Sequence, residues 1–299
     1  MPTASPLHFL RSLAAALLLA GCLLGPAQAG PPPVTDATGH MLQLPAPAQR
    51  VVSLAPHVTE LLYAIGAGER IVGAVSHSDW PPAARDLPRV GRHDSLDMER
   101  IAALRPDLVV GWASGNAAHQ VARLRRLGIP VYLTEPRALD DISATLRTLG
   151  VLVGGVDGMA AAEAFDARLA GLRARYAGAS PVRVFYQLWD RPLMTVGGDQ
   201  IITQALKLCG AENVFADQAA LAPQVSLEAV LAANPQVIVS AGEGDVAPRW
   251  LAEWRRWPFL HAVRADNLFQ VSPDLMHRPT PRLLDGIAEL CEQLAAARR

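Results

Sequence analysis

The chain contains one short pattern twice, and this repeat constrains its fold more than any other feature. The first copy, at 97–110, reads DMERIAALRPDLVV, and the second, at 226–239, reads SLEAVLAANPQVIV. Each has a capping residue, a Glu two positions later, a Pro seven positions after that Glu, and then an apolar run. The pattern predicts a short helix, stopped by the proline, that leads into a buried strand. Two copies in one chain predict two lobes of similar structure.

Strand-like and helix-like segments alternate around both copies. Short apolar runs bounded by glycine, proline or polar residues are separated by stretches with helical periodicity. The expected strands are 50–54, 71–75, 108–112, 130–134, 182–187, 237–240 and 268–271. Strands separated by helices are typical of parallel α/β units. We therefore predict an α/β fold with two Rossmann-like lobes and a ligand cleft between them.

A single long helix is expected between the two lobes. Residues 160–177 carry Phe165, Leu169, Leu172 and Tyr176 at helical spacing. A helix of about 20 residues spans roughly 30 Å, which is enough for a rigid connector. The alternative is an ordinary helix packed on one lobe. The predicted units are an N-terminal lobe at 48–156, a connecting helix at 157–179 and a C-terminal lobe at 180–299.

The first residues have the layout of a secretory signal. Arg11 precedes an apolar run at 13–24, and an Ala-x-Ala site follows that ends at Ala29. The run of about 12 residues is too short to span a membrane, because a spanning helix needs roughly 20. We expect a removable signal peptide at 1–29 and export to the periplasm. Lipidation of Cys22, which ends a lipobox-like sequence, is the alternative.

The cysteines, the net charge and the absence of known catalytic motifs limit the classes of protein to which the chain can belong. Apart from Cys22 the chain has only Cys209 and Cys291, an even pair in a compartment that permits disulfides. Two buried thiols are the alternative, since free cysteine packs as a small apolar residue. The formal net charge is -1, so no basic field indicates a nucleic-acid partner. The sequence has no Gly-x-Ser-x-Gly, His-Glu-x-x-His or phosphate-loop motif, so we do not expect an enzyme.

Three segments carry a resemblance to a known family. They are RVVSLAPHVTEL at 50–61, SDWPP at 78–82 and ERIAALRPDLVV at 99–110. Together they resemble the vitamin B12 (cobalamin)-binding proteins of bacterial ABC importers, in the helical-backbone class of periplasmic solute-binding proteins. The resemblance covers nearly the whole chain after the signal. It implies a monomeric receptor that captures a corrinoid and delivers it to the permease subunits, and a disulfide between Cys209 and Cys291.

The resemblance also implies a ligand site. Members of the family hold the corrin ring between aromatic side chains, and Trp112 matches the position of one of these. His77 and His93 stand where relatives carry aromatic residues, Trp189 neighbours another such position, and Asp274 matches a polar cleft position. We expect these five residues to surround the ligand, a cobalt corrinoid, with no further cofactor and no metal ion bound by the protein itself. Ordinary packing of Trp112 and surface roles for the two histidines are the alternatives.

Glu99 and Glu228 occupy the first turn of the two repeated helices. A carboxylate there interacts favourably with the helix dipole, by about 0.3 to 1 kcal/mol, and this alone explains a glutamate. The resemblance implies in addition that the pair docks onto basic residues of the permease, one per lobe. Two other functions stay open. One is haem or ferric-siderophore binding on the same scaffold, favoured by the histidine pair and the missing aromatics, and the other is an extracytoplasmic hydrolase or sensor domain.

Overall fold

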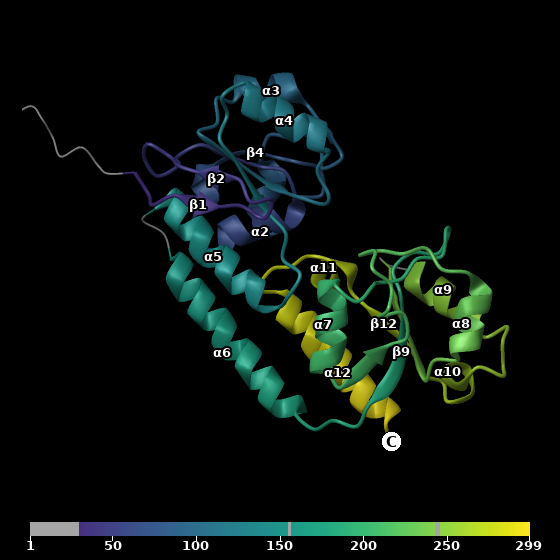
Figure 1. Cartoon of the computed structure of the whole chain (residues 1–299). Helices are drawn as coiled ribbons and strands as arrows, with labels where there is room; N and C mark the ends of the chain where they lie inside the picture. Colours follow the sequence, from purple (N-terminus) through teal and green to yellow (C-terminus); the bar gives the residue numbers. More distant parts are fainter. Residues whose placement is uncertain (1–29, 155–156, 243–245) are drawn as a thin grey trace, which may run out of the picture.

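Two lobes joined along one side by long helices make up the described part of the chain (Figure 1). The computed structural model describes residues 30–154, 157–242 and 246–299. The expected signal peptide, with Cys22, lies outside the described residues. In the described ranges, no helix combines the length and the apolar character needed to cross a membrane.

The N-terminal lobe is built on a parallel sheet with the strand order β4-β3-β7-β8. Its strands are β3 (Val51–Ser53), β4 (Ile71–Ala74), β7 (Leu108–Trp112) and β8 (Val131–Thr134). Helices α2 (Pro56–Ala64) and α5 (Asp140–Val153) pack on one face. Helices α3 (Met98–Ala103) and α4 (Ala118–Arg126) pack on the other. The short antiparallel pairs are β1 (Val34–Thr35) with β2 (Met41–Leu42) and β5 (Gly91–Arg92) with β6 (Ser95–Leu96).

The C-terminal lobe has a parallel sheet with the order β10-β9-β11-β12. Its strands are β9 (Val182–Gln187), β10 (Ala211–Asn213), β11 (Val237–Ala241) and β12 (Leu268–Val271). Helices α7 (Ile201–Leu208) and α12 (Leu283–Ala297) cover one face. Helices α8 (Leu227–Ala233), α9 (Val246–Trp254) and α10 (His261–Arg264) cover the other. The short α11 (Pro273–Met276) follows β12.

The two sheets share one topology, as the sequence repeat predicts. In each lobe the first strand is flanked by the second on one side and the third on the other, with the fourth beyond the third. The repeated helices begin alike: the Asp97 side chain accepts from the Arg100 N–H at 2.9 Å, and the Ser226 side chain from the Ala229 N–H at 3.1 Å. The predicted fold class is confirmed.

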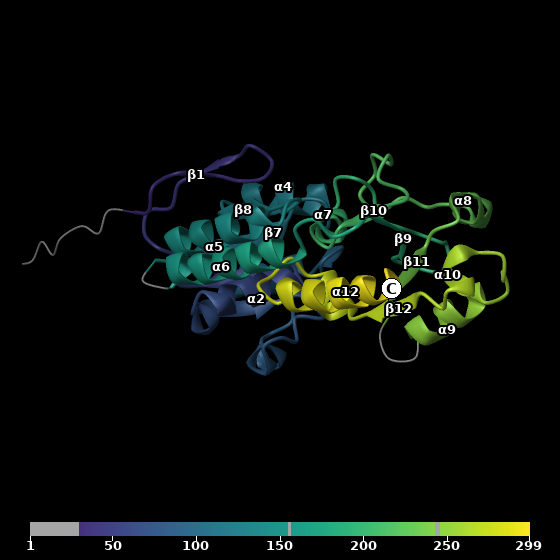
Figure 2. The same cartoon turned by 90° about the horizontal axis from the view of Figure 1, so that it is seen from below.

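Helix α6 (Gly158–Tyr176) is the covalent link between the lobes and lies along α5 (Figure 2). Its Phe165 and Leu169 are buried in one apolar cluster that also holds side chains from both sheets and from α5 and α12. The apolar core therefore runs without a break from one lobe to the other. At the far end of the C-terminal lobe, Cys209 and Cys291 form the predicted disulfide, which joins the end of α7 to α12.

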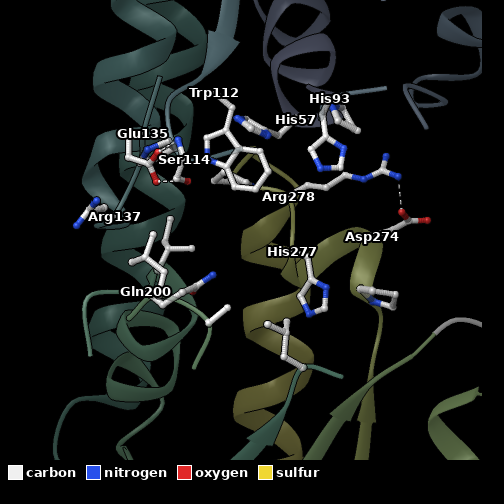
Figure 3. Close-up of a pocket in the computed structure, with 18 of the residues that line it drawn as sticks. His57, His93, Trp112, Ser114, Glu135, Arg137, Gln200, Asp274, His277 and Arg278 are labelled. Carbon is white, nitrogen blue, oxygen red and sulfur yellow. Dashed lines mark hydrogen bonds and ion pairs between the residues drawn. The ribbon is translucent and has the colours of Figure 1, made fainter. Parts of the chain in front are cut away.

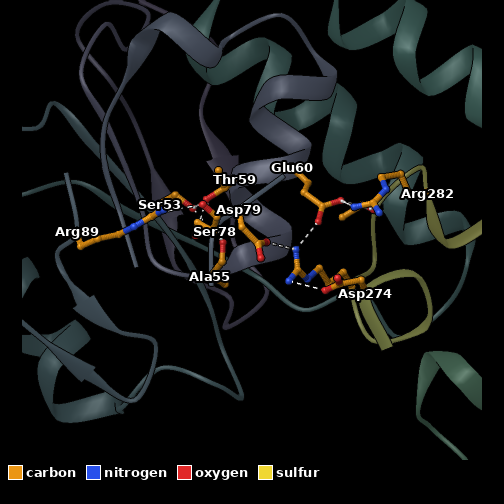
Figure 4. A network of polar contacts seen from close by, with 11 residues as sticks. Ser53, Ala55, Thr59, Glu60, Ser78, Asp79, Arg89, Asp274 and Arg282 are labelled. Carbon is orange, nitrogen blue, oxygen red and sulfur yellow. Dashed lines mark hydrogen bonds and ion pairs between the residues drawn. The ribbon is translucent and has the colours of Figure 1, made fainter. Parts of the chain in front are cut away.

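An ion cluster around one buried carboxylate holds the two lobes together (Figure 4). We define the inter-lobe ion cluster as Glu60, Asp79, Asp274, Arg278 and Arg282. Glu60 belongs to α2 of the N-terminal lobe and is only 4% exposed. One of its oxygens lies 2.9 Å from Arg278 Nη1, and the other lies 3.2 Å from Arg282 Nη1. Both arginines come from the C-terminal lobe, so one carboxylate bridges the two halves.

The same arginines make further contacts. Arg278 Nη1 lies 2.9 Å from Asp79 Oδ1 and Arg278 Nη2 lies 2.6 Å from Asp274 Oδ1. The Arg282 guanidinium lies 4.1 Å from the centre of the Trp80 ring, a cation–π contact across the lobes. Burial raises the pKa of Asp79, but its hydrogen bond and charge contact with Arg278 outweigh burial and hold that pKa below its usual value. The segment after α11 is thus held to the N-terminal lobe by paired charges.

Candidate functional site

A cavity of about 590 Å³ lies between the lobes (Figure 3). In one lobe its walls come from segments that follow β3, β4, β7 and β8 and from the turn between β5 and β6. In the other lobe they come from segments that follow β9 and β12, precede α7, or lie between β10 and α8. The carboxyl ends of these strands therefore lie at the cavity. Open parallel sheets bind ligands at the carboxyl ends of their strands, beside the point where the strand order reverses. In this fold two such points face each other.

Trp112, the last residue of β7, points its ring into the cavity (Figure 3). Its backbone N–H donates to Asn116 Oδ1 at 2.7 Å. Behind the ring lies Gly115, where a Cβ atom would come within 1.8 Å of Trp112 Cε3. Only glycine leaves the indole room to adopt this position, so the ring is supported on one side and half-exposed toward the cavity.

Asn116 couples Trp112 to a histidine. Its side chain is 5% exposed, and its Nδ2 donates to the carbonyls of Leu54 at 3.0 Å and of His93 at 2.7 Å. The His93 and Trp112 ring centres are 6.1 Å apart. One buried amide therefore fixes the end of β3, the tryptophan and the His93 turn as a rigid wall.

Two further imidazoles are uncharged at neutral pH. His57 meets Trp112 edge to face at 5.5 Å between ring centres, and burial together with the positive charge of Arg278 lowers its pKa to about 3. Burial also lowers the pKa of His277 to about 4, although Asp274 opposes this. The Nε2 of His277 lies 3.1 Å from the Tyr186 hydroxyl. The two rings offer hydrogen bonds rather than charge to a ligand.

The structure brings together four of the five expected ligand residues. Trp112, His77, His93 and Asp274 line the cavity. Trp189 does not line it: its ring lies 5.7 Å from that of Trp250, and its Nε1 donates to the Arg191 carbonyl at 3.2 Å. Successive residues of an extended chain point in opposite directions. Leu188 takes the cavity side, so Trp189 is turned to the outer surface and is 55% exposed.

Further lining residues were not predicted from the sequence. They include Ser114, Glu135, Arg137, Gln200, His277 and Arg278. Glu135 and Arg137 directly follow the predicted strand at 130–134, and this position could have identified them. His277 and Arg278 follow a one-turn helix, for which the sequence has no comparable pattern. Glu99 and Glu228 are exposed in the first turns of α3 and α8 and do not line the cavity.

The family assignment follows from residues 51–275, which match the family model described as periplasmic binding protein. The chain belongs to the periplasmic binding protein family. It is similar to the vitamin B12-binding protein of Vibrio cholerae serotype O1, with 39% identity over 264 residues that cover 88% of this chain and 95% of that protein. It is also similar to the vitamin B12-binding protein of Yersinia pestis, with 36% identity over 86% of this chain and 90% of that protein.

Solved structures of the family have the same architecture. The crystal structure of the periplasmic vitamin B12-binding protein BtuF of Vibrio cholerae matches with a TM-score of 0.78 and 39% identity, over 85% of this chain and 99% of that one. The periplasmic heme-binding protein RhuT from Roseiflexus matches with a TM-score of 0.74 and 24% identity, over 84% of this chain and 100% of that one. The second likeness concerns the fold alone.

The buried histidines make stability depend on pH. The pKa of His57 in the folded protein lies below the ordinary value of 6.5, so between pH 6.5 and about 3 the unfolded chain binds a proton that the folded protein does not. Stability is present above pH 6.5 and falls as the pH is lowered. From pH 7 to pH 5, His57 should reduce the free energy of unfolding by about 2 kcal/mol. Urea unfolding of wild type and His57→Gln at both pH values measures this, and equal losses in the two proteins would contradict it.

Proposed function

We propose that this protein is the extracytoplasmic substrate-binding component of an ABC importer and that it binds cobalamin or a related corrinoid in the inter-lobe cavity. The observation that carries the proposal is the cavity wall around Trp112, on a chain that matches vitamin B12-binding proteins over most of its length. The expected role is capture and delivery, without chemistry on the ligand.

The chemistry of the cavity suits a corrinoid. A corrin is a broad, nearly flat macrocycle with amide groups around its edge. The indole of Trp112 presents a flat apolar face, and Leu188, Leu221 and Ala222 form an aliphatic wall opposite. The uncharged rings of His57 and His277 supply hydrogen bonds suited to neutral amides.

Haem or a ferric siderophore is the second candidate. His77 and His93 line the cavity, and the described part of the chain offers no hydrogen-bond partner for their ring nitrogens. Imidazole is a good ligand for iron, so this pair favours a metal-containing macrocycle of either kind.

We infer that residues 1–29 direct export to the periplasm and are then removed, with lipidation at Cys22 as the alternative. The mature protein acts as a monomer that meets the permease subunits of its importer. Glu99 and Glu228 support this because they lie on corresponding helices of the two lobes, exposed and outside the cavity.

Replacement of Trp112 should weaken corrinoid binding. Loss of ring stacking, on the order of 1 kcal/mol, together with lost apolar burial, should raise the Kd of Trp112→Ala about tenfold or more. Calorimetry with cyanocobalamin measures this, with Trp189→Ala as the matched control that should leave affinity unchanged. Haemin titrated into wild type separates the two candidates, and tight haemin binding with no heat from cyanocobalamin would refute the corrinoid proposal.

Removal of the two surface glutamates should separate delivery from capture. Glu99→Ala combined with Glu228→Ala should leave the Kd for cyanocobalamin nearly unchanged, because neither carboxylate lines the cavity. Uptake by cells that carry the matching importer should fall, because the paired charges orient the complex. Glu163→Ala, at an exposed position of α6, is the matched control. A loss of ligand affinity in the double variant would overturn this division of roles.

A further inference from the structure

We propose that Arg137 binds the phosphodiester of the nucleotide loop of cobalamin, and that it thereby distinguishes cobalamin from cobinamide, which lacks this loop. The inference rests on the proposed function, because it names the part of a corrinoid that one residue of the cavity recognises. It follows from the distribution of charge on the cavity walls.

Arg137 is held at the cavity by a rigid loop. It lies between β8 and α5, next to the buried Pro136. The backbone N–H groups of Arg137 and Ala138 donate to Asp141 Oδ2 at 2.9 and 2.8 Å. The loop is therefore fixed at the start of α5, while the Arg137 side chain is exposed and lines the cavity. Figure 3 shows it apart from Arg278, on the other side of Trp112.

The two arginines that line the cavity differ in their partners. Arg278 is shared among the carboxylates of Glu60, Asp79 and Asp274, so its charge is balanced inside the protein. The guanidinium of Arg137 makes no hydrogen bond or ion pair with any described residue. Among the described residues that line the cavity, Arg137 is therefore the arginine whose charge is not balanced by a protein carboxylate and can pair with a ligand.

The carboxylates nearest to Arg137 in the sequence are engaged elsewhere. Glu135 accepts from the Ser114 N–H at 2.7 Å and from the Ser114 hydroxyl at 3.0 Å. Asp140 accepts from both terminal nitrogens of Arg173, at 2.9 and 2.6 Å. Asp141 accepts from the loop backbone as described above. These bonds explain why Arg137 stays unpaired beside three acidic residues.

The opposite wall offers a second donor and one competing group. Gln200, which comes from the C-terminal lobe and lies below Arg137 in Figure 3, uses its amide oxygen to accept from the Ile202 N–H at 2.5 Å. Its NH₂ group remains available to an anion. Asp199 is an exposed carboxylate on the same wall and is the residue that would compete for Arg137.

The ligand supplies one matching group. The amides on the edge of a corrin are neutral, whereas the nucleotide loop of cobalamin carries a phosphodiester with one negative charge. A guanidinium presents a planar fork of donors that matches two phosphate oxygens, which an ammonium group cannot do. Because Arg137 is exposed, salt should weaken this contact.

The test compares two corrinoids on matched variants. We expect Arg137→Gln to raise the Kd for cyanocobalamin about tenfold, close to the lower end of the range for a hydrogen bond to a charged group, and to leave the Kd for cyanocobinamide unchanged. Arg137→Lys should lose less, because it keeps the charge but not the fork. Arg126→Gln removes the same charge from an exposed position of α4 in the same lobe, outside the cavity, and should alter neither Kd.

For each ligand, the Kd of the variant is divided by the Kd of wild type. This ratio removes the difference in affinity that comes from the other contacts that cobinamide lacks. The Kd of wild type for cyanocobalamin should also rise with salt more steeply than that of Arg137→Gln. Equal changes for both corrinoids, or no change for either, would overturn the role of Arg137 and leave the proposed function standing. Wild type that binds neither corrinoid would overturn the proposed function and this inference with it. Thermal melting of each variant verifies that it is folded.

Discussion

The geometry of the cleft depends on the ion pairs that the buried Glu60 carboxylate forms with Arg278 and Arg282. A charge with 4% exposure is costly unless it is paired, and its partners Arg278 and Arg282 lie 218 and 222 residues further along the chain. The carboxylate is satisfied only when both lobes occupy the arrangement seen in the structure. The continuous apolar core and helix α6 also hold the two lobes in this arrangement. We therefore expect only a small closing motion when a ligand binds.

The duplicated topology explains why there is one central site. Each sheet directs the carboxyl ends of its strands toward the other, so loops from both lobes meet at one cavity. The two walls nevertheless differ in chemistry. The N-terminal wall carries Trp112 and His93, fixed together by Asn116. The C-terminal wall combines aliphatic side chains with polar ones, among them Gln200, Asp274 and His277. The fold sets the place of the site, and the loops set what it recognises.

Local pattern was enough to predict the fold and part of the site. The repeat identified two lobes, and Trp112 ends the predicted strand at 108–112, whereas His93 was expected only from the resemblance to the family. Trp189 lies outside the cavity because its neighbour Leu188 takes the inward direction, and a sequence alone does not resolve this alternation near a strand end. The pairing of Glu60 with Arg278 could not be predicted, because nothing in the local sequence identifies a partner 218 residues away.

A crystal structure of the complex with cyanocobalamin would show directly where the ligand binds and whether the lobes move. We expect a corrin ring in the inter-lobe cavity, against the exposed face of Trp112. The contacts of Glu60 with Arg278 and Arg282 should be kept, and the lobes should keep nearly the same relation as without ligand. A corrinoid bound outside this cavity would refute the assignment of the site, and one bound after the lobes have rotated apart and broken the Glu60 contacts would refute the fixed arrangement of the lobes.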